Sequence, residues 1–279
     1  MKLSVVTPNF NSVRWLPDCA ASVRHAGVGR NFEHWVVDGG STDGSLNFLK
    51  AHPELHWFSE PDRGLYDALN KGIARASGEI IGHLNADEQY NRAGLQAAWA
   101  ILESRPEIDA VFGPTVMVNA EGQFLQLLKQ VTIPRVADAV WHMPVQSCSL
   151  IYRKRIWERL AYDVHFRLVG DHVWFYGQMK LGLRLAVVRE PLGIFTWRAD
   201  NLSSSGASED AFAGRRCDTF SLKLAKYFFR LRKLLAGGYR PEPVDYEIIR
   251  NGSVVAEHVA RPALKLPRSA FSGQKALKP

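Results

Sequence analysis

Acidic and amide side chains follow several short apolar runs of this 279-residue chain. Asn85, Asp87 and Glu88 come directly after GEIIGHL, and Asp38 ends the run HWVVD. A carboxylate at the end of a buried strand is unfavourable unless it meets water or a cation. Mg²⁺ and Mn²⁺ take such hard oxygen ligands and keep positions open for phosphate oxygens. The pattern therefore indicates a site for a divalent metal and a phosphate. The structural alternative for Asp87 is a cap on the helix that begins near Asn91.

Strand and helix patterns alternate over the first hundred residues. Strands are predicted at 3–7, 34–38, 55–59, 78–85 and 109–113, and helices at 44–51, 65–76 and 92–104. This alternation is typical of the α/β class, with a mainly parallel sheet covered by helices on both faces. Ligands of such sheets bind at the carboxyl ends of the strands. We therefore expect the polar residues after the strands to meet at one edge.

Downstream, the pattern predicts a hairpin around Glu121 and Gly122, further strands at 146–152, 183–188 and 193–197, and helices at 153–160 and 170–182. The serine-rich and glycine-rich stretch 203–208 predicts a boundary. It separates a catalytic domain at 1–205 from an extension at 206–279. The extension is predicted to hold a basic amphipathic helix at 220–235, a hairpin turning at Asn251 and Gly252, and a loose tail.

The positive charge of the chain is local. The 35 Lys and Arg residues exceed the 28 Asp and Glu residues by seven, and the segment 215–240 alone carries this excess. A local excess of this kind favours an anionic partner. The helix at 220–235 either packs on the catalytic domain through its apolar face or lies at an anionic membrane surface. Nucleic acid is not expected as a partner, because no reader motif accompanies the charge.

Several classes of protein are excluded or disfavoured by what the sequence lacks. The three cysteines form no CxxC pair, which argues against a disulfide framework and a structural zinc site. No GxGxxG follows the first strand and no GxxxxGK[ST] is present, so dehydrogenase and NTPase functions are disfavoured. The N-terminus reaches Pro8 too early for a signal peptide, and no apolar run is long enough to span a membrane. We therefore expect a cytoplasmic location.

The chain resembles the bacterial family 2 glycosyltransferases in the ordered segments SVVTPNFN, VVDGGSTDGS, SEPDRGLYDALNKGIARASGEIIGHLNADE, VQSCSLIYRKRIWERL and GDHVWFYGQMKLG. The likeness is strongest to enzymes that build exopolysaccharide, O-antigen and colanic-acid repeat units, and it covers roughly residues 1–205. It implies a GT-A fold, a Mg²⁺ or Mn²⁺ cofactor and inverting transfer from a nucleotide-sugar donor, most often a UDP-sugar. It also implies an acceptor that is a glycan or a polyprenyl-diphosphate-linked oligosaccharide, and a peripheral location at the inner face of the plasma membrane.

The resemblance assigns roles to residues that match the family's motifs. The nucleotide-sugar residues it implies are Thr7, Pro8, Asn9, Asp38, Asp62, Asn70, Lys71, Asn85, Ala86 and Gln146. Within this set Asp38 matches the acid that recognises the base. Asn85, Ala86 and Asp87 match the family's DxD-type motif, with Asn85 replacing its first aspartate, and Asp87 is the implied metal contact.

The resemblance also assigns Asp171 as the general base that takes the proton of the acceptor hydroxyl. Its structural alternative is an N-cap of the helix at 170–182. For Gln146 the alternative is a strand residue bonded to backbone, and for Asp38 it is a loop acid that binds nearby amides. Arg198, where the family often has a histidine, could meet the diphosphate as a cation. The competing functions are a nucleotidyltransferase and a catalytically degenerate, membrane-associated binding protein.

Overall fold

The structure is a computed structural model that describes residues 1–139, 143–198 and 219–264. The predicted domain boundary at residue 205 and the loose tail lie outside the described residues. In the part of the chain that the structure describes, every helix is too short or too polar to cross a bilayer.

The central sheet has seven strands in the order β10-β6-β9-β4-β1-β2-β3. Its parallel core consists of β1 (Leu3–Asn9), β2 (Phe32–Asp38), β3 (His56–Ser59) and β4 (Ile80–His83). Every residue of β1 is buried, as expected for a strand covered on both faces. The predicted mainly parallel α/β class is confirmed. The remaining strands are β6 (Ala110–Phe112), β9 (Leu150–Arg153), which runs antiparallel to β4 and β6, and β10 (Leu185–Val187).

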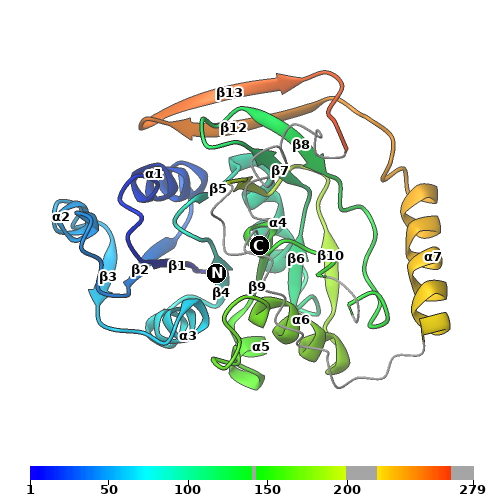
Figure 1. The fold of residues 1–279 in the computed structure, drawn as a ribbon, viewed down its shortest axis with the longest axis horizontal. Helices are drawn as coiled ribbons and strands as arrows, with labels where there is room; N and C mark the ends of the chain where they lie inside the picture. The colour runs from blue at the N-terminus through cyan, green and yellow to red at the C-terminus, as the bar shows by residue number, and fades with distance from the viewer. Residues whose placement is uncertain (140–142, 199–218, 265–279) are drawn as a thin grey trace, which may run out of the picture.

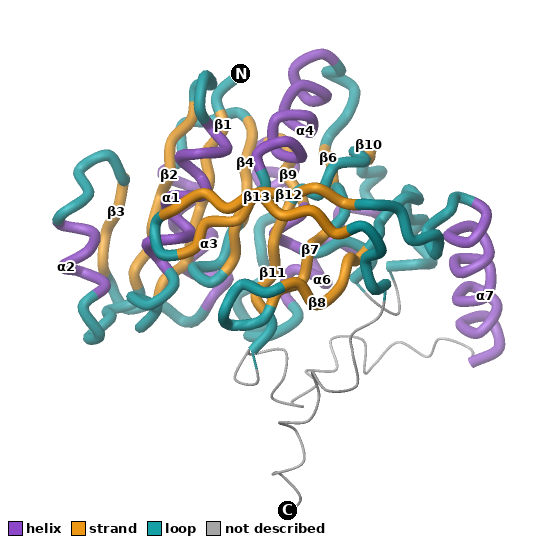
Figure 2. Tube along the Cα trace, turned by 90° about the horizontal axis from the view of Figure 1, so that it is seen from above, coloured by secondary structure: helices purple, strands orange, loops and turns teal. Residues whose placement is uncertain are grey.

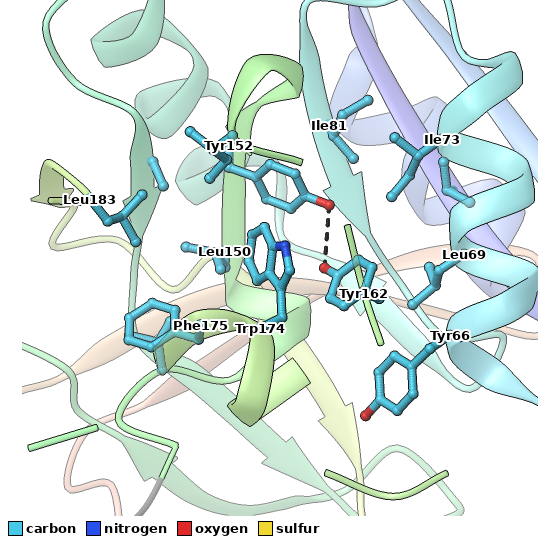
Figure 3. Close-up of a cluster of buried hydrophobic side chains, with 14 of the residues drawn as sticks. Tyr66, Leu69, Ile73, Ile81, Leu150, Tyr152, Tyr162, Trp174, Phe175 and Leu183 are labelled. Carbon is cyan, nitrogen blue, oxygen red and sulfur yellow. Dashed lines mark hydrogen bonds between the residues drawn. The ribbon is translucent and has the colours of Figure 1, made fainter. Parts of the chain in front are cut away.

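Helices cover both faces of this sheet (Figure 1). One face packs on α3 (Leu65–Arg75), α5 (Lys154–Arg159) and α6 (Gly170–Lys180), and the other on α1 (Leu16–Gly27) and α4 (Arg92–Ser104). Successive side chains of a strand point to opposite faces of the sheet. Val6 therefore packs in the buried cluster under α3, α5 and α6, which we call the first cluster, and its neighbour Val5 packs in a second cluster under α1 and α4. Figure 3 shows the first cluster, in which Trp174 packs between Tyr152 and Tyr162. The short helix α2 (Ser45–Lys50) precedes β3.

A second sheet has the order β5-β11-β7-β8. It consists of β5 (Glu88–Tyr90), β7 (Thr115–Val118), β8 (Phe124–Leu128) and β11 (Gly193–Thr196), and β7 and β8 form the predicted hairpin. Strand β5 was not predicted. It pairs antiparallel with β11, with Glu88 opposite Phe195. This register brings the residues just after β11 to the turn just before β5.

The C-terminal region adds a helix and a hairpin. The hairpin consists of β12 (Val244–Arg250) and β13 (Ser253–Val259) and turns at Asn251 and Gly252, as predicted. It lies over the second sheet, where Val244, Tyr246 and Ile248 share a buried cluster with that sheet (Figure 2). The helix α7 (Thr219–Leu235) stands at the margin of the molecule in both views.

Candidate functional site

Asp38 organises the carboxyl ends of three adjacent strands. It lies opposite Asn9 in the register of β2 and β1, and it is fully buried. Its Oδ1 accepts hydrogen bonds from Asn9 Nδ2 at 2.7 Å and Ser41 Oγ at 2.5 Å, and its Oδ2 from Ser59 Oγ at 2.7 Å. Burial alone would raise the pKa of Asp38, but these hydrogen bonds lower it overall, so the group stays ionised. Asp38 also accepts hydrogen bonds from the amides of Gly40 and Ser41. These bonds are the ones expected if Asp38 is a loop acid that binds nearby amides.

The other first-strand residues divide between core and edge. Thr7 is buried, and its Oγ1 lies 2.8 Å from Nε2 of His34, whose pKa is lowered to about 3 by burial. Pro8 is buried in the same strand, opposite Val37. Asn9 differs, because its Oδ1 is a buried acceptor without a hydrogen-bond donor among the described residues. A ligand N–H near this oxygen would satisfy it.

An exposed aromatic ring at this edge was missed by the sequence analysis. Phe10 directly follows β1 and is 63% exposed, although its neighbour Asn9 is buried. A Cβ atom on Gly39 would lie 2.6 Å from Asp62 Oδ2 and 3.4 Å from the Phe10 ring, so both side chains converge on Gly39. Asp62 also accepts a hydrogen bond from the Gly64 amide. The signal that could have found Phe10 is a large apolar residue at a predicted polar edge.

Asn70 and Lys71 already have partners within the protein. The Asn70 amide donates to the Tyr162 carbonyl at 2.8 Å, and its Oδ1 accepts from Trp157 Nε1 at 2.8 Å. Lys71 Nζ lies 3.0 Å from Glu60 and 3.2 Å from Asp67. These contacts alone account for both residues. Their assignment to the nucleotide stays a prediction.

The DxD-type motif forms the turn between β4 and β5. Asn85 Oδ1 lies 3.0 Å from Nε2 of His83, and Ala86 is buried in an apolar cluster. Asp87 is partly exposed and forms an ion pair with Arg198, with 3.4 Å between Oδ2 and Nη2. The alternative that Asp87 caps the helix near Asn91 is wrong, because the strand β5 separates Asp87 from α4.

Arg198 reaches Asp87 because β11 pairs with β5. Its guanidinium also lies over the Trp15 ring, 5.1 Å from the centroid, at the start of α1. Cation–π and ionic contacts together fix the guanidinium beside the carboxylate. A fixed cation is therefore available next to the candidate metal contact.

Glu88 is a buried carboxyl group at the end of this turn, where β5 begins. Its Oε2 accepts the Asn85 amide at 2.8 Å, and its Oε1 has no hydrogen-bond partner among the described residues. Burial, with the nearby charge of Asp87, raises the pKa of Glu88 to about 8. Glu88 is therefore largely neutral at pH 7 and adds little negative charge to the turn.

Asp171 lies on α6, next to α3. Its Oδ1 accepts hydrogen bonds from the Tyr66 hydroxyl at 3.1 Å and the His172 amide at 2.8 Å. Its Oδ2 accepts no hydrogen bond from the described residues, which leaves that oxygen available to a substrate hydroxyl. The N-cap alternative is wrong, since α6 begins at Gly170 and its N-cap is Val169. Gly170 is required there, because a Cβ would lie 2.5 Å from the Tyr66 ring.

Ring contacts bring Asp171 toward the turn, because its partner Tyr66 stacks on Tyr162 at 5.6 Å and the Tyr162 ring lies 6.3 Å from the His83 ring. Its charge acts on the pKa of His83 and of Glu88, which flank Asn85 and Asp87. Burial lowers the pKa of His83, so its imidazole is neutral. A chain of contacts through Tyr66, Tyr162 and His83 thus links Asp171 on α6 to the turn that holds Asn85.

Gln146 precedes the short 3-10 helix Ser147–Ser149 rather than lying in a strand. Its carbonyl accepts the Ser149 amide, while its side chain makes no hydrogen bond with the described residues. The alternative of a strand glutamine bonded to backbone is therefore wrong.

The donor set at the turn offers few ligands for a divalent metal. Within the described residues, no group of three or more His, Cys, Asp or Glu side chains could hold a metal by itself. Asp87 offers one partly exposed carboxylate, whereas the Asn85 oxygen is bonded to His83. This arrangement fits an ion that takes one protein carboxylate and fills its other positions with diphosphate oxygens and water.

These features define a Rossmann-like α/β protein with an acidic site at the carboxyl edge of its sheet. Residues 4–169 match the family model for glycosyl transferase family 2, and the chain belongs to this family. The nucleotidyltransferase alternative is therefore not supported. Family membership supports a role in glycosyl transfer.

Relatives and solved structures agree with this family. The chain is 40% identical over 91 residues to an uncharacterised glycosyltransferase of Mycobacterium tuberculosis, over 32% of this chain and 35% of the relative. It is 32% identical over 120 residues to a PGL/p-HBAD biosynthesis glycosyltransferase of Mycobacterium bovis, over 41% of this chain and 46% of the relative. The matched segments thus span less than half of these relatives.

The fold is similar to that of S. aureus TarS 1-349 in complex with UDP, with a TM-score of 0.57 and 18% identity, over 71% of this chain and 61% of that one. It is also similar to the mannosyltransferase PcManGT from Pyrobaculum calidifontis in complex with GDP-Man and Mn²⁺, with a TM-score of 0.53 and 19% identity, over 72% and 58%. At this identity the likeness concerns the fold, and it confirms the predicted fold class.

Proposed function

We propose that the chain is an inverting glycosyltransferase that moves a sugar from a nucleotide diphosphate to a hydroxyl of a glycan. The observation that carries this proposal is the position of Asp171. Tyr66 and the His172 amide bind its Oδ1, and its charge reaches the turn that holds Asp87. This arrangement supports a base beside the proposed diphosphate site.

In the proposed step, the acceptor oxygen attacks the anomeric carbon from the side opposite the diphosphate. The acceptor O–H proton passes to the Asp171 carboxylate, and the bond between the anomeric carbon and the diphosphate oxygen breaks with its electron pair on the leaving group. Tyr66 orients Asp171 by donating to Oδ1, which leaves Oδ2 to receive the proton.

Asp87 is the proposed metal contact, and Arg198 the proposed cation for the diphosphate. A divalent metal, when bound, would supply positive charge to the leaving diphosphate. The complex of PcManGT with GDP-Man and Mn²⁺ supports this cofactor. The ion pair between Arg198 and Asp87 at 3.4 Å supports this role, because it holds the guanidinium beside the proposed metal contact.

The nucleoside is proposed to bind at the ends of β1 and β2. The unsatisfied Asn9 Oδ1 suits a base that carries an N–H donor, Asp38 holds the Asn9 side chain in place, and Phe10 offers a ring for stacking. A UDP-sugar is the proposed donor, supported by the TarS complexes with UDP and UDP-GlcNAc.

The proposed acceptor is a hydroxyl of a growing glycan carried on a polyprenyl diphosphate at the inner face of the plasma membrane. The motif resemblance to exopolysaccharide and O-antigen enzymes supports this acceptor. Gln146, whose side chain makes no hydrogen bond with the described residues, is proposed to contact the donor sugar or the acceptor.

A donor panel tests the proposal. The protein is incubated with Mn²⁺ and UDP-, GDP- or dTDP-sugars, and nucleoside diphosphate release is measured with and without EDTA. We expect metal-dependent release from one donor class. Asp171→Asn should lower turnover by about 10²–10⁴-fold with little change in nucleotide affinity, whereas Asp163→Asn, at a partly exposed acid bonded to His165, should not.

Two outcomes would contradict the proposal. Unchanged turnover in Asp171→Asn would exclude it as the base. Nucleotide binding without release from any donor would instead support the degenerate binding protein.

A further inference from the structure

The helix α7 carries a continuous stripe of exposed apolar side chains. Tyr227 is 61% exposed, Leu234 57% and Leu235 79%, and Leu224 and Phe228 are exposed as well. Together with the half-buried Leu231 they span an arc of about 120° at 100° per residue. Within the described chain, none of these side chains belongs to a buried hydrophobic cluster.

A different face of α7 is turned to the protein. Arg232 forms an ion pair with the buried Asp138. Arg232 lies about 80–100° from the centre of the stripe on the helical wheel. The stripe is therefore not the surface that holds α7 on the described body. Among the described residues, the alternative in which the helix packs through its large apolar face is not supported.

Cations border the stripe on its other side. On the helical wheel, Arg230 and then Lys226 lie next to the edge of the stripe that Tyr227 and Leu234 form. Arg240, just beyond the helix, is exposed. The Lys233 ammonium lies over the Tyr239 ring, 5.4 Å from its centroid. Aromatic and aliphatic side chains bordered by Lys and Arg are the composition of helices that lie at lipid interfaces.

We propose that α7 docks on an anionic lipid surface, with its apolar stripe in the headgroup region and Lys226 and Arg230 on lipid phosphates. The segment 215–240 holds the whole positive excess of the chain, so charge complementarity favours this partner. A second copy of the chain would bring two such positive segments together, which is unfavourable. The inference concerns where the protein works and does not rest on the proposed chemistry.

Vesicle sedimentation of the full chain tests the inference. The probes are phosphatidylcholine vesicles with and without phosphatidylglycerol, at low and high salt. We expect binding only to the anionic vesicles, weakened by salt. Because each cation near an anionic leaflet strengthens binding by about fivefold, Lys226→Gln/Arg230→Gln should weaken it by about thirtyfold. Tyr227→Ser/Phe228→Ser should weaken it by about tenfold or more, because it removes the apolar contact.

The matched control is Lys50→Gln/Arg105→Gln, which removes the same charge from exposed positions on other elements. It should keep most of the binding. Equal loss in this control, or no sedimentation with anionic vesicles at low salt, would overturn the inference. A dimer in light scattering that Tyr227→Ser/Phe228→Ser converts to a monomer would also overturn it, because the stripe would then contact a second copy. Melting temperatures close to wild type would show that the variants are folded.

Discussion

Asp87 and Asp171 are carboxylates of the same edge, but their neighbours give them different chemistry. Asp87 faces the Arg198 guanidinium, whereas Asp171 accepts a hydrogen bond from the neutral Tyr66 hydroxyl. Burial, and then the charge of Asp171, raise the pKa of Tyr66 well above its usual value, so Tyr66 remains a donor. A carboxylate and a guanidinium side by side offer one group to a metal ion and one to a phosphate, while a carboxylate held by a neutral donor suits proton transfer.

Asp87→Ala should therefore abolish transfer and remove the metal dependence of nucleotide binding. The reason is that it deletes the carboxylate that the turn offers to the ion, while Arg198 loses its ion pair with that carboxylate. Calorimetry of UDP binding with and without Mn²⁺ measures the effect, with the exposed Asp245→Ala as control. Retained turnover with normal metal dependence would rule out the metal assignment. Asn85→Asp should tighten Mn²⁺ binding if residue 85 lies near the ion.

At the scale of elements, the start of α6 is set by its contact with α3. A Cβ on Gly170 would lie 2.5 Å from the Tyr66 ring, so only glycine allows this approach. Figure 3 shows Tyr66 at the margin of the buried cluster, next to Tyr162. The two rings are stacked, with 5.6 Å between their centroids. The position of Asp171 therefore depends on how closely the two helices pack.

Gly170→Ala should lower kcat by about tenfold or more, since an angstrom-scale displacement of a catalytic group has effects of this size. UDP affinity should change little, because the displaced group faces the acceptor. Gly177→Ala on the same helix is the control, since its Cβ would meet only the end of the flexible Leu160 side chain. Equal kinetics in both variants would show that the contact with Tyr66 does not position the base.

A second element-scale feature lies at the opposite edge of the sheet. Glu33 on β2 accepts hydrogen bonds from Lys2 at 2.6 Å, Ser4 at 2.6 Å and the Ser77 amide at 2.7 Å. Burial alone would raise the pKa of Glu33, but these donors lower it to about 2. The ionised carboxylate therefore joins β1, β2 and the start of the segment that leads into β4.

Glu33→Gln should lower the free energy of unfolding at pH 7 by roughly 1–3 kcal/mol. Because the folded pKa lies below the ordinary value of 4.5, the stability from ionised Glu33 is complete above that value and declines as pH falls toward about 2. The difference between variant and wild type should therefore shrink over this range in urea unfolding. A difference that stays constant from pH 7 to 3 would contradict the assignment. The exposed Glu54→Gln serves as control.

At the scale of the molecule, the C-terminal hairpin is part of the packed body. Glu247 lies 2.8 Å from His25 of α1, and the Gln89 side chain bonds the backbone of Ile249 in both directions. Its apolar side chains cover the second sheet at Val116 and Ile194. The hairpin therefore supports the strands β5 and β11 that place Asp87 beside Arg198.

Truncation after residue 240 should lower the melting temperature strongly. It exposes the cluster now covered by Val244, Tyr246 and Ile248, each contributing about 1.5–3 kcal/mol when buried. Truncation after residue 264 is the control and should melt near the full chain. Similar melting of both truncated chains would show that the hairpin is an independent unit.

Much of this arrangement follows from local sequence patterns. The apolar runs before Asp38 and Asn85 predict parallel strands, and such strands bring the residues at their carboxyl ends to one edge. The helix at 92–104 and the turn at Asn251 were likewise predicted, because their periodicity and turn residues act over a few positions. The family motifs added the expected roles of Asp87 and Asp171.

Other features depend on contacts between distant segments. The ion pair of Arg198 with Asp87 exists because β11 pairs with β5, a strand too short to give a local pattern. Tyr66 bonds Asp171 across 105 positions of the chain, and the internal partners of Asn70 lie 92 and 87 positions away. The exposure of the α7 stripe also depends on tertiary structure. The amphipathic pattern of a helix is the same whether its apolar face is packed against the protein or exposed. Only tertiary packing decides which strands pair and which face of a helix is covered, because neither choice changes the local periodicity of the sequence.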